Sequence, residues 1–106
     1  MAVVGGDHIR AIYSVSWSPK TVAGYHFIAT AGADNQLCVY KIHEKELESG
    51  AQVKPALCAN IQSAHLNDIN CVEFCPDAET GLKLATCSDD CTIRIWSLEV
   101  EKAAAD

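Results

Sequence analysis

The stretch that decides the fold is His8-Ile-Arg-Ala-Ile-Tyr-Ser-Val-Ser-Trp-Ser-Pro19, because it returns 57 positions later as His65-Leu-Asn-Asp-Ile-Asn-Cys-Val-Glu-Phe-Cys-Pro76. Each copy then runs on to an aspartate, a short apolar stretch and an aromatic residue. Repeated units of this size cannot bury their apolar faces alone and stack on like neighbours. We therefore expect a repeat architecture whose function depends on the surface that the stacked units present.

The two copies align with a single one-residue gap. Before the gap Gly24 pairs with Gly81, and after it Asp34 pairs with Asp90. The alternation of apolar and polar residues predicts three strands in each copy. These strands are expected at 11–17, 26–32 and 36–42 in the first copy and at 68–74, 82–88 and 92–97 in the second. Neither copy contains the pattern of a long helix, so the sequence predicts an all-β fold.

The remaining segments complete the predicted organisation. The first repeat occupies residues 1–42 and is followed by a polar, charged stretch at 43–54, which predicts an exposed loop between strands. Residues 55–98 hold an apolar stretch at 55–62, expected to be an outer fourth strand, and then the second repeat. The tail at 99–106 is rich in Ala and Glu, which favours fraying or a short helical end.

Composition limits the classes of function. Apolar residues make up 49% of the 106 residues, enough for a core, and 14 acidic against 8 basic residues give a net charge of −6. Without a Lys/Arg cluster we expect neither nucleic acid nor an anionic membrane surface as a ligand. The chain begins without the features of a signal peptide and has no run long enough to span a bilayer, which predicts a soluble intracellular protein with its six cysteines reduced.

Four residues of the second copy are of the types that form one hydrogen-bonded chain. The expected order runs from the indole N–H of Trp96 to the hydroxyl of Thr86, from this hydroxyl to His65, and from the imidazole N–H to Asp90. Each of these polar groups needs a partner when buried, and this order provides one for all of them. The matching residues of the first copy are His8, Thr30, Asp34 and Tyr40, where a phenol replaces the indole and is expected to shorten or end the network.

A threonine, a histidine and an aspartate also invite a catalytic interpretation, with Thr86 as nucleophile and His65 as base. We disfavour it, because the same three residue types recur at corresponding positions of both copies, as scaffolding does and a single active site does not. We therefore predict no catalytic residue.

The cysteines offer a second chemical alternative. Cys71, Cys75, Cys87 and Cys91 form two C-x3-C pairs whose thiolates could bind zinc or a cluster. This spacing is weak evidence for a metal site, and the first copy has no cysteine at the matching places. We predict small thiols without a metal or other cofactor, and keep a Cys-based metal-binding protein as the less favoured alternative.

Two aromatic residues and two turns carry further expectations. Trp17 and Phe74 fall on strands and are predicted to be core aromatics between the units. Asn35 and Cys91 follow the turn aspartates, where a left-handed backbone is expected. Asn tolerates that conformation better than Cys does, but we expect both turns to form.

The string Leu-Ala-Thr-Cys-Ser-Asp-Asp-Cys-Thr-Ile-Arg-Ile-Trp (84–96), with the upstream Ala-His pair, resembles a WD40 repeat, whose blades are held by a tetrad of His, Ser or Thr, Asp and Trp. Further strings at 8–17, 29–40 and 64–72 resemble the last two blades of the WD40 family of cytosolic iron–sulfur assembly proteins. The resemblance covers about residues 8–98.

This resemblance implies a β-propeller fragment of two four-stranded antiparallel blades, from a family with seven. It implies a protein-interaction scaffold and not an enzyme, which helps to deliver iron–sulfur clusters to apo-proteins of the cytoplasm and also of the nucleus. The implied partners are subunits of the targeting complex and the recipient apo-proteins. The alternative is an unrelated WD40 scaffold of a ubiquitin ligase, a coat or a chromatin complex, which the tetrad does not distinguish.

The shortness of the chain has a physical consequence. Two blades stand where the family has seven, so we expect either a fragment or a chain that associates with further blades. An open two-blade unit exposes an apolar face and strand edges, which favours aggregation or capture of a partner.

Overall fold

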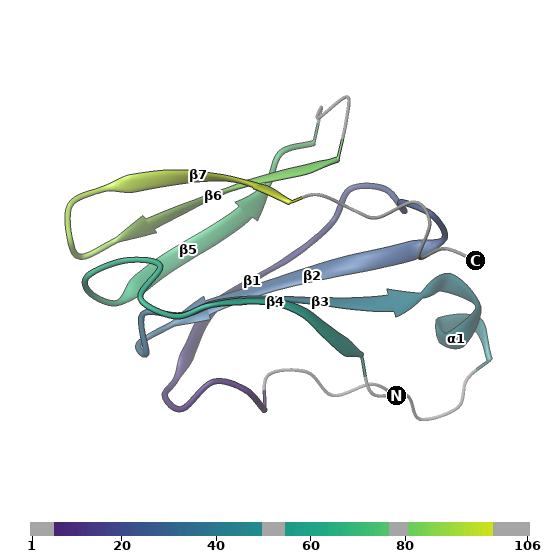
Figure 1. The fold of residues 1–106 in the computed structure, drawn as a ribbon, viewed down its shortest axis with the longest axis horizontal. Helices are drawn as coiled ribbons and strands as arrows, with labels where there is room; N and C mark the ends of the chain where they lie inside the picture. The colour runs from purple at the N-terminus through teal and green to yellow at the C-terminus, as the bar shows by residue number, and fades with distance from the viewer. Residues whose placement is uncertain (1–5, 50–54, 77–80, 99–106) are drawn as a thin grey trace.

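The computed structural model describes residues 6–49, 55–76 and 81–98, which form two antiparallel sheets stacked as two layers (Figure 1). The first sheet has the order β1-β2-β3-β4, and the second has the order β5-β6-β7. The strands are β1 (Ile12–Trp17), β2 (Tyr25–Gly32), β3 (Leu37–His43), β4 (Ala56–Ile61), β5 (Ile69–Phe74), β6 (Leu82–Ser88) and β7 (Ile93–Leu98). The predicted strands and the all-β class are confirmed.

The second sheet differs from the prediction of two four-stranded blades. Among the described residues it has three strands, and β7 is its edge. In the first sheet, β4 pairs with the corresponding edge of β3. The segment that supplies this fourth strand lies between the two copies, and the second copy is followed by no comparable described segment. The expected short end of the tail falls at 99–106, outside the described residues.

The two sheets are copies of one structural unit down to an irregularity in their pairing. The register shifts between Ile12 and Ser14 where β1 pairs with β2, and between Ile69 and Cys71 where β5 pairs with β6. These two bulges lie at the same place in the two sequence copies. A β-bulge increases the twist of its strand, so both units bend alike at the start of the first strand.

The polar stretch at 43–54 contains a short helix, α1 (Glu44–Glu48), where the sequence predicted only a loop. His43 caps it: its Nδ1 accepts the amide of Lys45 at 3.1 Å, and the carboxylate of Glu46 accepts the amide of His43 at 3.4 Å. This is the reciprocal arrangement of a capping box. Histidine is an uncommon residue at the cap, which is why the pattern did not signal a helix. None of the helix residues is buried, as expected of an exposed segment.

The core lies between the two sheets. One face of the first sheet packs on one face of the second, and the cluster consists of Phe27, Ala29, Ala31, Leu37, Val39, Ala64, Ile69, Val72, Phe74, Leu82 and Leu84. Phe74 is buried as predicted, whereas the prediction for Trp17 is wrong. The side chain of Trp17 is 50% exposed because it lies on the face of the first sheet that points away from the second.

Both turns that follow the middle strands form with a left-handed residue. Asn35 has φ 64° and Cys91 has φ 71°, at matching places after Asp34 and Asp90. The turn prediction is therefore confirmed, and Cys91 adopts a backbone conformation that costs a non-glycine residue free energy. No helix of the described residues is both long and apolar enough to cross a membrane.

Candidate functional site

The turns that connect β2 to β3 and β6 to β7 lie at the same edge of the molecule, together with the β4–β5 connection (Figure 1). Each turn carries an aspartate, Asp34 or Asp90, that points back to a histidine before the first strand of its own unit. The tetrad residues therefore come together at this edge. Because the strands are antiparallel, the start of β1 lies beside the turn that follows β2, and the start of β5 lies beside the turn that follows β6.

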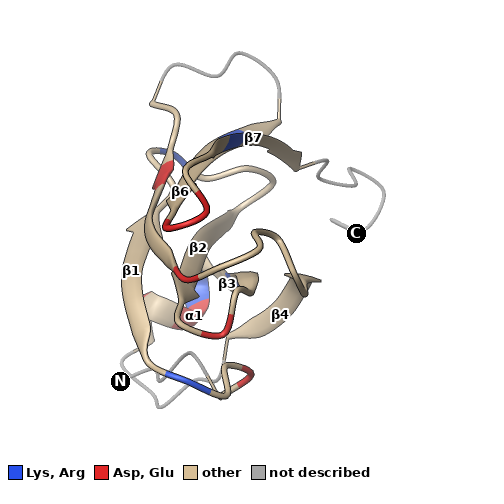
Figure 2. Ribbon diagram, turned by 90° about the vertical axis from the view of Figure 1, so that its left-hand side faces the viewer, with Lys and Arg blue, Asp and Glu red and all other residues tan. Residues whose placement is uncertain are grey.

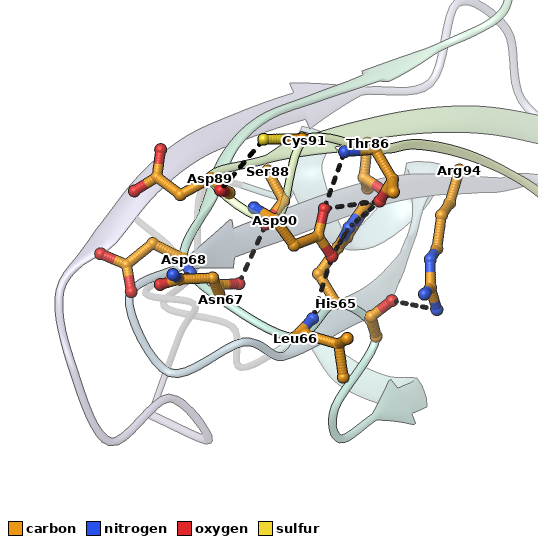
Figure 3. Close-up of polar contacts among 12 residues, drawn as sticks. His65, Leu66, Asn67, Asp68, Thr86, Ser88, Asp89, Asp90, Cys91 and Arg94 are labelled. Atoms are coloured by element: carbon orange, nitrogen blue, oxygen red, sulfur yellow. Dashed lines mark hydrogen bonds and ion pairs between the residues drawn. The ribbon is translucent and has the colours of Figure 1, made fainter.

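In the second unit the four residues form a continuous series of contacts, of which Figure 3 shows His65, Thr86 and Asp90. The indole N–H of Trp96 donates to the hydroxyl oxygen of Thr86 at 3.0 Å. This oxygen lies 2.6 Å from Nε2 of His65, and Nδ1 of His65 lies 2.9 Å from the carboxylate of Asp90. A hydroxyl that donates to Nε2 and an imidazole that donates from Nδ1 give every group a partner.

The first unit repeats two of these three contacts. Nε2 of His8 lies 2.7 Å from the hydroxyl of Thr30, and its Nδ1 lies 2.9 Å from the carboxylate of Asp34. Tyr40 does not extend the series as Trp96 does, because its hydroxyl donates to the carboxylate of Asp7 at 3.0 Å. Asp7 was not anticipated from the sequence, although its place directly before His8 is the signal that could have indicated it.

The two aspartates also hold the backbone that follows each histidine. Asp34 accepts the amide of Ile9 at 2.9 Å, and Asp90 accepts the amide of Leu66 at 3.0 Å. In each unit one carboxylate thus fixes an imidazole and the next peptide together. Sequence reasoning assigned these aspartates only the imidazole contact.

The surroundings lower the pKa of both carboxyl groups. For Asp90 the main cause is the hydrogen bond from the hydroxyl of Thr92; burial opposes it, and the bonds from Leu66 and His65 add to it. The pKa of Asp90 therefore lies well below its ordinary value. For Asp34 burial is the largest influence and acts to raise the pKa. The hydrogen bonds from His8 and from backbone amides outweigh it, so the net shift is downward.

The pKa of the Tyr40 phenol shifts in the opposite direction, upward. Burial raises its pKa well above the ordinary value, and the hydrogen bond to the carboxylate of Asp7 raises it further. The phenol therefore stays protonated and donates to Asp7.

The burial of the tetrad side chains limits the chemistry that they can perform. The side chains of His65 and Thr86 are 0% and 1% exposed, and those of His8 and Asp34 are also buried. A nucleophile must reach its substrate, and here each hydroxyl is enclosed by its own partners. The arrangement is suited to joining strands and turns within a sheet.

Residues beside the tetrads form a surface that we call the loop edge, which consists of the exposed Ile9, Leu66, Asn67 and Asp89 and the half-buried Asp68. Ile9 and Leu66 occupy the same place in the two units, directly after the tetrad histidines, and each is 81% exposed. Figure 2 looks onto this edge and shows acidic residues on several of its loops. The loop edge therefore combines two protruding apolar side chains with negative charge.

Local hydrogen bonds order the acidic part of the loop edge (Figure 3). The amide of Asp89 donates to the carbonyl of Asp68 at 3.0 Å, and the side-chain amide of Asn70 donates to the carboxylate of Asp89 at 2.8 Å. The hydroxyl of Ser88 donates to the carbonyl of Asn67 at 3.2 Å. These bonds tie the β4–β5 connection to the β6–β7 turn.

Of the four cysteines considered as metal ligands, two, Cys71 and Cys87, lie opposite each other on neighbouring strands, and the other two lie beyond strand ends. Cys71 is on β5 and Cys75 follows that strand, whereas Cys87 is on β6 and Cys91 is in the turn. No group of three or more His, Cys, Asp or Glu residues in the described ranges has the arrangement of a metal site. All six cysteines are free thiols.

Comparison with known proteins defines the class of this fold. Residues 57–97 match the family described as WD domain, G-beta repeat. This range holds β4 to β7, including the tetrad of the second unit, and the first unit has the same strand order and the same bulge. Residues 57–97 are thus a WD40 repeat, and the two antiparallel sheets have the arrangement of a partial WD40 propeller.

Several relatives of the chain are named as cytosolic iron–sulfur protein assembly proteins. The chain is 35% identical over 101 residues to the "Probable cytosolic iron-sulfur protein assembly protein ciao1-A" of Salmo salar, which is 95% of this chain and 28% of the relative. Over 96 residues it is 36% identical to the CIAO1 protein of that name from Rattus norvegicus, 91% of this chain and 26% of the relative. The Homo sapiens protein is 34% identical over 99 residues, 93% of this chain and 27% of the relative. The chain therefore spans little more than a quarter of these relatives.

Proposed function

We propose that this chain is a protein-docking scaffold of cytosolic iron–sulfur protein assembly, which helps to deliver clusters to apo-proteins. The observation that carries the proposal is the similarity over more than nine-tenths of the chain, both units included, to relatives that carry that name. The same similarity supports the cytoplasm as its place, and we propose the nucleus as a second compartment on the family resemblance of the sequence alone. We also propose that residues 1–42 are the first WD40 repeat and that residues 55–98 hold the outer strand and the second repeat.

The proposed role is not catalytic. The burial of His65 and Thr86 supports this, because a substrate would have to separate hydrogen bonds of 2.6–3.0 Å within a sheet to reach them. The eight residues at the tetrad positions, Tyr40 included, are proposed to be structural and to hold strands and turns in place. The histidine, threonine and aspartate of the tetrad recur in both units, as expected of a scaffold.

The proposed docking surface is the loop edge. Ile9 and Leu66 are large, exposed apolar side chains, and the backbone amide of each donates to the turn aspartate of its unit and so fixes its position. Apolar side chains on an ordered backbone cost little entropy to immobilise, which favours binding of a protein partner. The net charge of −6 disfavours nucleic acid, and the proposed partners are subunits of the iron–sulfur targeting complex and apo-protein recipients.

The test combines co-purification with a cluster-dependent readout. The tagged chain is expressed in cells, and co-purification of targeting-complex subunits is measured for the wild type and for a variant with Ile9→Asp and Leu66→Asp. A matched control carries Leu47→Asp, which changes an exposed leucine of α1 outside the loop edge. We expect the double variant to lose the subunits and the control to retain them.

The second readout separates cytosolic assembly from iron–sulfur chemistry in general. Depletion of the protein is expected to lower the activity of a cytosolic iron–sulfur enzyme while a mitochondrial one is unchanged. Two results together contradict the proposal: the wild-type chain co-purifies with no targeting-complex subunit, and depletion leaves the activity of the cytosolic iron–sulfur enzyme unchanged.

A further inference from the structure

Two of the six cysteines lie in register on neighbouring strands of the second sheet. Cys71 of β5 and Cys87 of β6 are cross-strand partners in the antiparallel pairing of these strands. All six cysteines fall in the described ranges, and no other two of them are register partners there. Register partners project from the same face of a sheet, so these two side chains are neighbours.

The spacing of register partners suits a disulfide. In an antiparallel pair their Cα atoms lie about 4.5–5.5 Å apart, within the range of about 4.4–6.8 Å that a disulfide spans. Their Cβ atoms also lie about 4.5–5.5 Å apart, whereas a disulfide brings these atoms to about 3.5–4.5 Å. Closure therefore requires the two strands to approach by roughly 1 Å at this pair.

An irregularity in the pairing directly beside Cys71 permits this movement. The register between β5 and β6 shifts between Ile69 and Cys71. A β-bulge interrupts the ladder of hydrogen bonds and leaves one residue unpaired, so the backbone is less constrained there than in a regular ladder. The first unit has the same irregularity between Ile12 and Ser14, but the register partner of Ser14 is Ala31. The pair of thiols is therefore specific to the second unit.

The present contacts of the Cys71 thiol also allow the bond to form. Both cysteines are free thiols, and Sγ of Cys71 lies 4.0 Å from the carbonyl oxygen of Val72. A thiol is a weak donor, so this long contact costs little to break. Rotation of the side chain towards Cys87 is thus opposed only weakly by this contact.

We propose that Cys71 and Cys87 are a redox-active pair that closes to a cross-strand disulfide when the chain meets an oxidising low-molecular-weight disulfide such as oxidised glutathione. The thiolate of one cysteine attacks a glutathione sulfur, which forms a mixed disulfide and releases one glutathione. The thiolate of the other cysteine attacks the protein sulfur of this mixed disulfide and releases the second glutathione. One protein S–S bond forms and the glutathione S–S bond breaks. The two thiol protons of the protein pass to the two leaving glutathione thiolates, so the protein loses two electrons and glutathione gains them.

The bond joins two strands of one sheet, so it does not depend on what lies against that face. It closes a loop that contains the connection between β5 and β6, which restricts the unfolded chain and stabilises the folded one. Cys87 stands between Thr86 of the tetrad and Ser88, whose hydroxyl donates to the carbonyl of Asn67 in the loop edge. Oxidation is therefore expected to stabilise the strands that support the loop edge, and reduction reverses it.

The test maps disulfides in the purified full chain. The chain is incubated with mixtures of reduced and oxidised glutathione, remaining thiols are blocked with N-ethylmaleimide, and the bonds are identified by peptide mass spectrometry. We expect Cys71–Cys87 to be the main intramolecular bond, to accumulate as the oxidised fraction rises and to open with dithiothreitol. In urea its share should fall by roughly threefold or more, because loop closure in an unfolded chain favours cysteines nearer in sequence, such as Cys71 with Cys75.

Two variants each remove one partner. Cys71→Ser and Cys87→Ala introduce the residue types that the first unit carries at the matching positions. Each is expected to form no such bond and to hold its remaining thiol as a mixed disulfide with glutathione. Cys75→Ser, in the same unit, is the matched control and is expected to close the bond as the wild type does. Oxidation should raise the urea midpoint of the wild type and of this control, and should not raise that of Cys71→Ser.

Three results contradict the proposal: both thiols stay reduced at a high oxidised fraction, either one pairs mainly with another cysteine, or the share of the bond is equal in buffer and in urea. An unchanged urea midpoint after closure contradicts the stabilising effect. If a variant does not fold, the comparison of wild-type chain in buffer and in urea still decides. These measurements use the purified chain alone, so their failure is distinct from a failure of the proposed cellular function.

Discussion

The hydroxyl oxygen of Thr86 lies 2.6 Å from Nε2 of His65, and neither side chain is more than 1% exposed. One neutral hydroxyl thus connects β6 to the segment before β5, and it also accepts the indole N–H of Trp96. A group with two such connections supports the packing of its unit, because the loss of either one leaves a buried polar atom without a partner.

Removal of this hydroxyl tests its structural role. Thr86→Val keeps the shape of the side chain but leaves Nε2 of His65 without a partner. We expect the free energy of unfolding to fall by about 1–3 kcal/mol, the usual cost of an unsatisfied buried polar group. Urea denaturation measures it. Thr21→Val, at an exposed threonine, is the matched control and is expected to change stability by less than about 0.5 kcal/mol.

The difference between the two units predicts different energetic coupling. Trp96 shares a hydrogen bond with Thr86, whereas the Tyr40 hydroxyl bonds to Asp7 and not to Thr30. In double-mutant cycles, Trp96→Phe and Thr86→Val should couple by about 0.5–3 kcal/mol. Tyr40→Phe and Thr30→Val should be additive to within about 0.5 kcal/mol. Equal coupling in both units would show that the phenol belongs to the network after all.

The lowered pKa of Asp90 predicts a loss of stability in acid. Its folded pKa lies below the unfolded value of about 3.9, so the unfolded state binds the proton first as pH falls. The stabilisation is complete above that value and is lost progressively as pH drops below about 4. Urea midpoints measured from neutral to acid pH should fall for the wild type. Asp90→Asn should be less stable at neutral pH and should show a flatter acid limb; an equal slope in both proteins refutes this assignment.

The two left-handed turn residues predict different responses to substitution by glycine. Cys91 has φ 71°, a conformation that costs a non-glycine residue roughly 1–2 kcal/mol, while glycine adds about 0.5–1 kcal/mol of unfolded-state entropy. Cys91→Gly is therefore expected to stabilise the protein by about 0.5 kcal/mol. Asn35→Gly should be nearly neutral, because asparagine tolerates φ 64° well. Thermal unfolding of the two variants compares them, and a destabilised Cys91→Gly contradicts the strain.

The sequence predicted the strands and the partners of the buried histidines because those features repeat locally. The alternation of apolar residues identified β1 and β5, and the copy-to-copy alignment brought Asp34 and Asp90 into equivalent turns. It could not predict the exposure of Trp17, because the face of a strand is buried only if another unit covers it, and that depends on the stacking. The partner of Tyr40 was also missed, because Asp7 is distant from Tyr40 in the sequence and the two side chains meet only in the folded sheet.

The most direct test of the structural account is the hydrogen pattern of the second tetrad, read by NMR. In 15N-labelled protein we expect the ring of His65 to carry its hydrogen on Nδ1 with Nε2 as an acceptor, and the indole N–H of Trp96 to exchange slowly with solvent. A His65 ring with its hydrogen on Nε2, or ring and indole hydrogens that exchange rapidly, would contradict a closed network and with it the scaffold assignment.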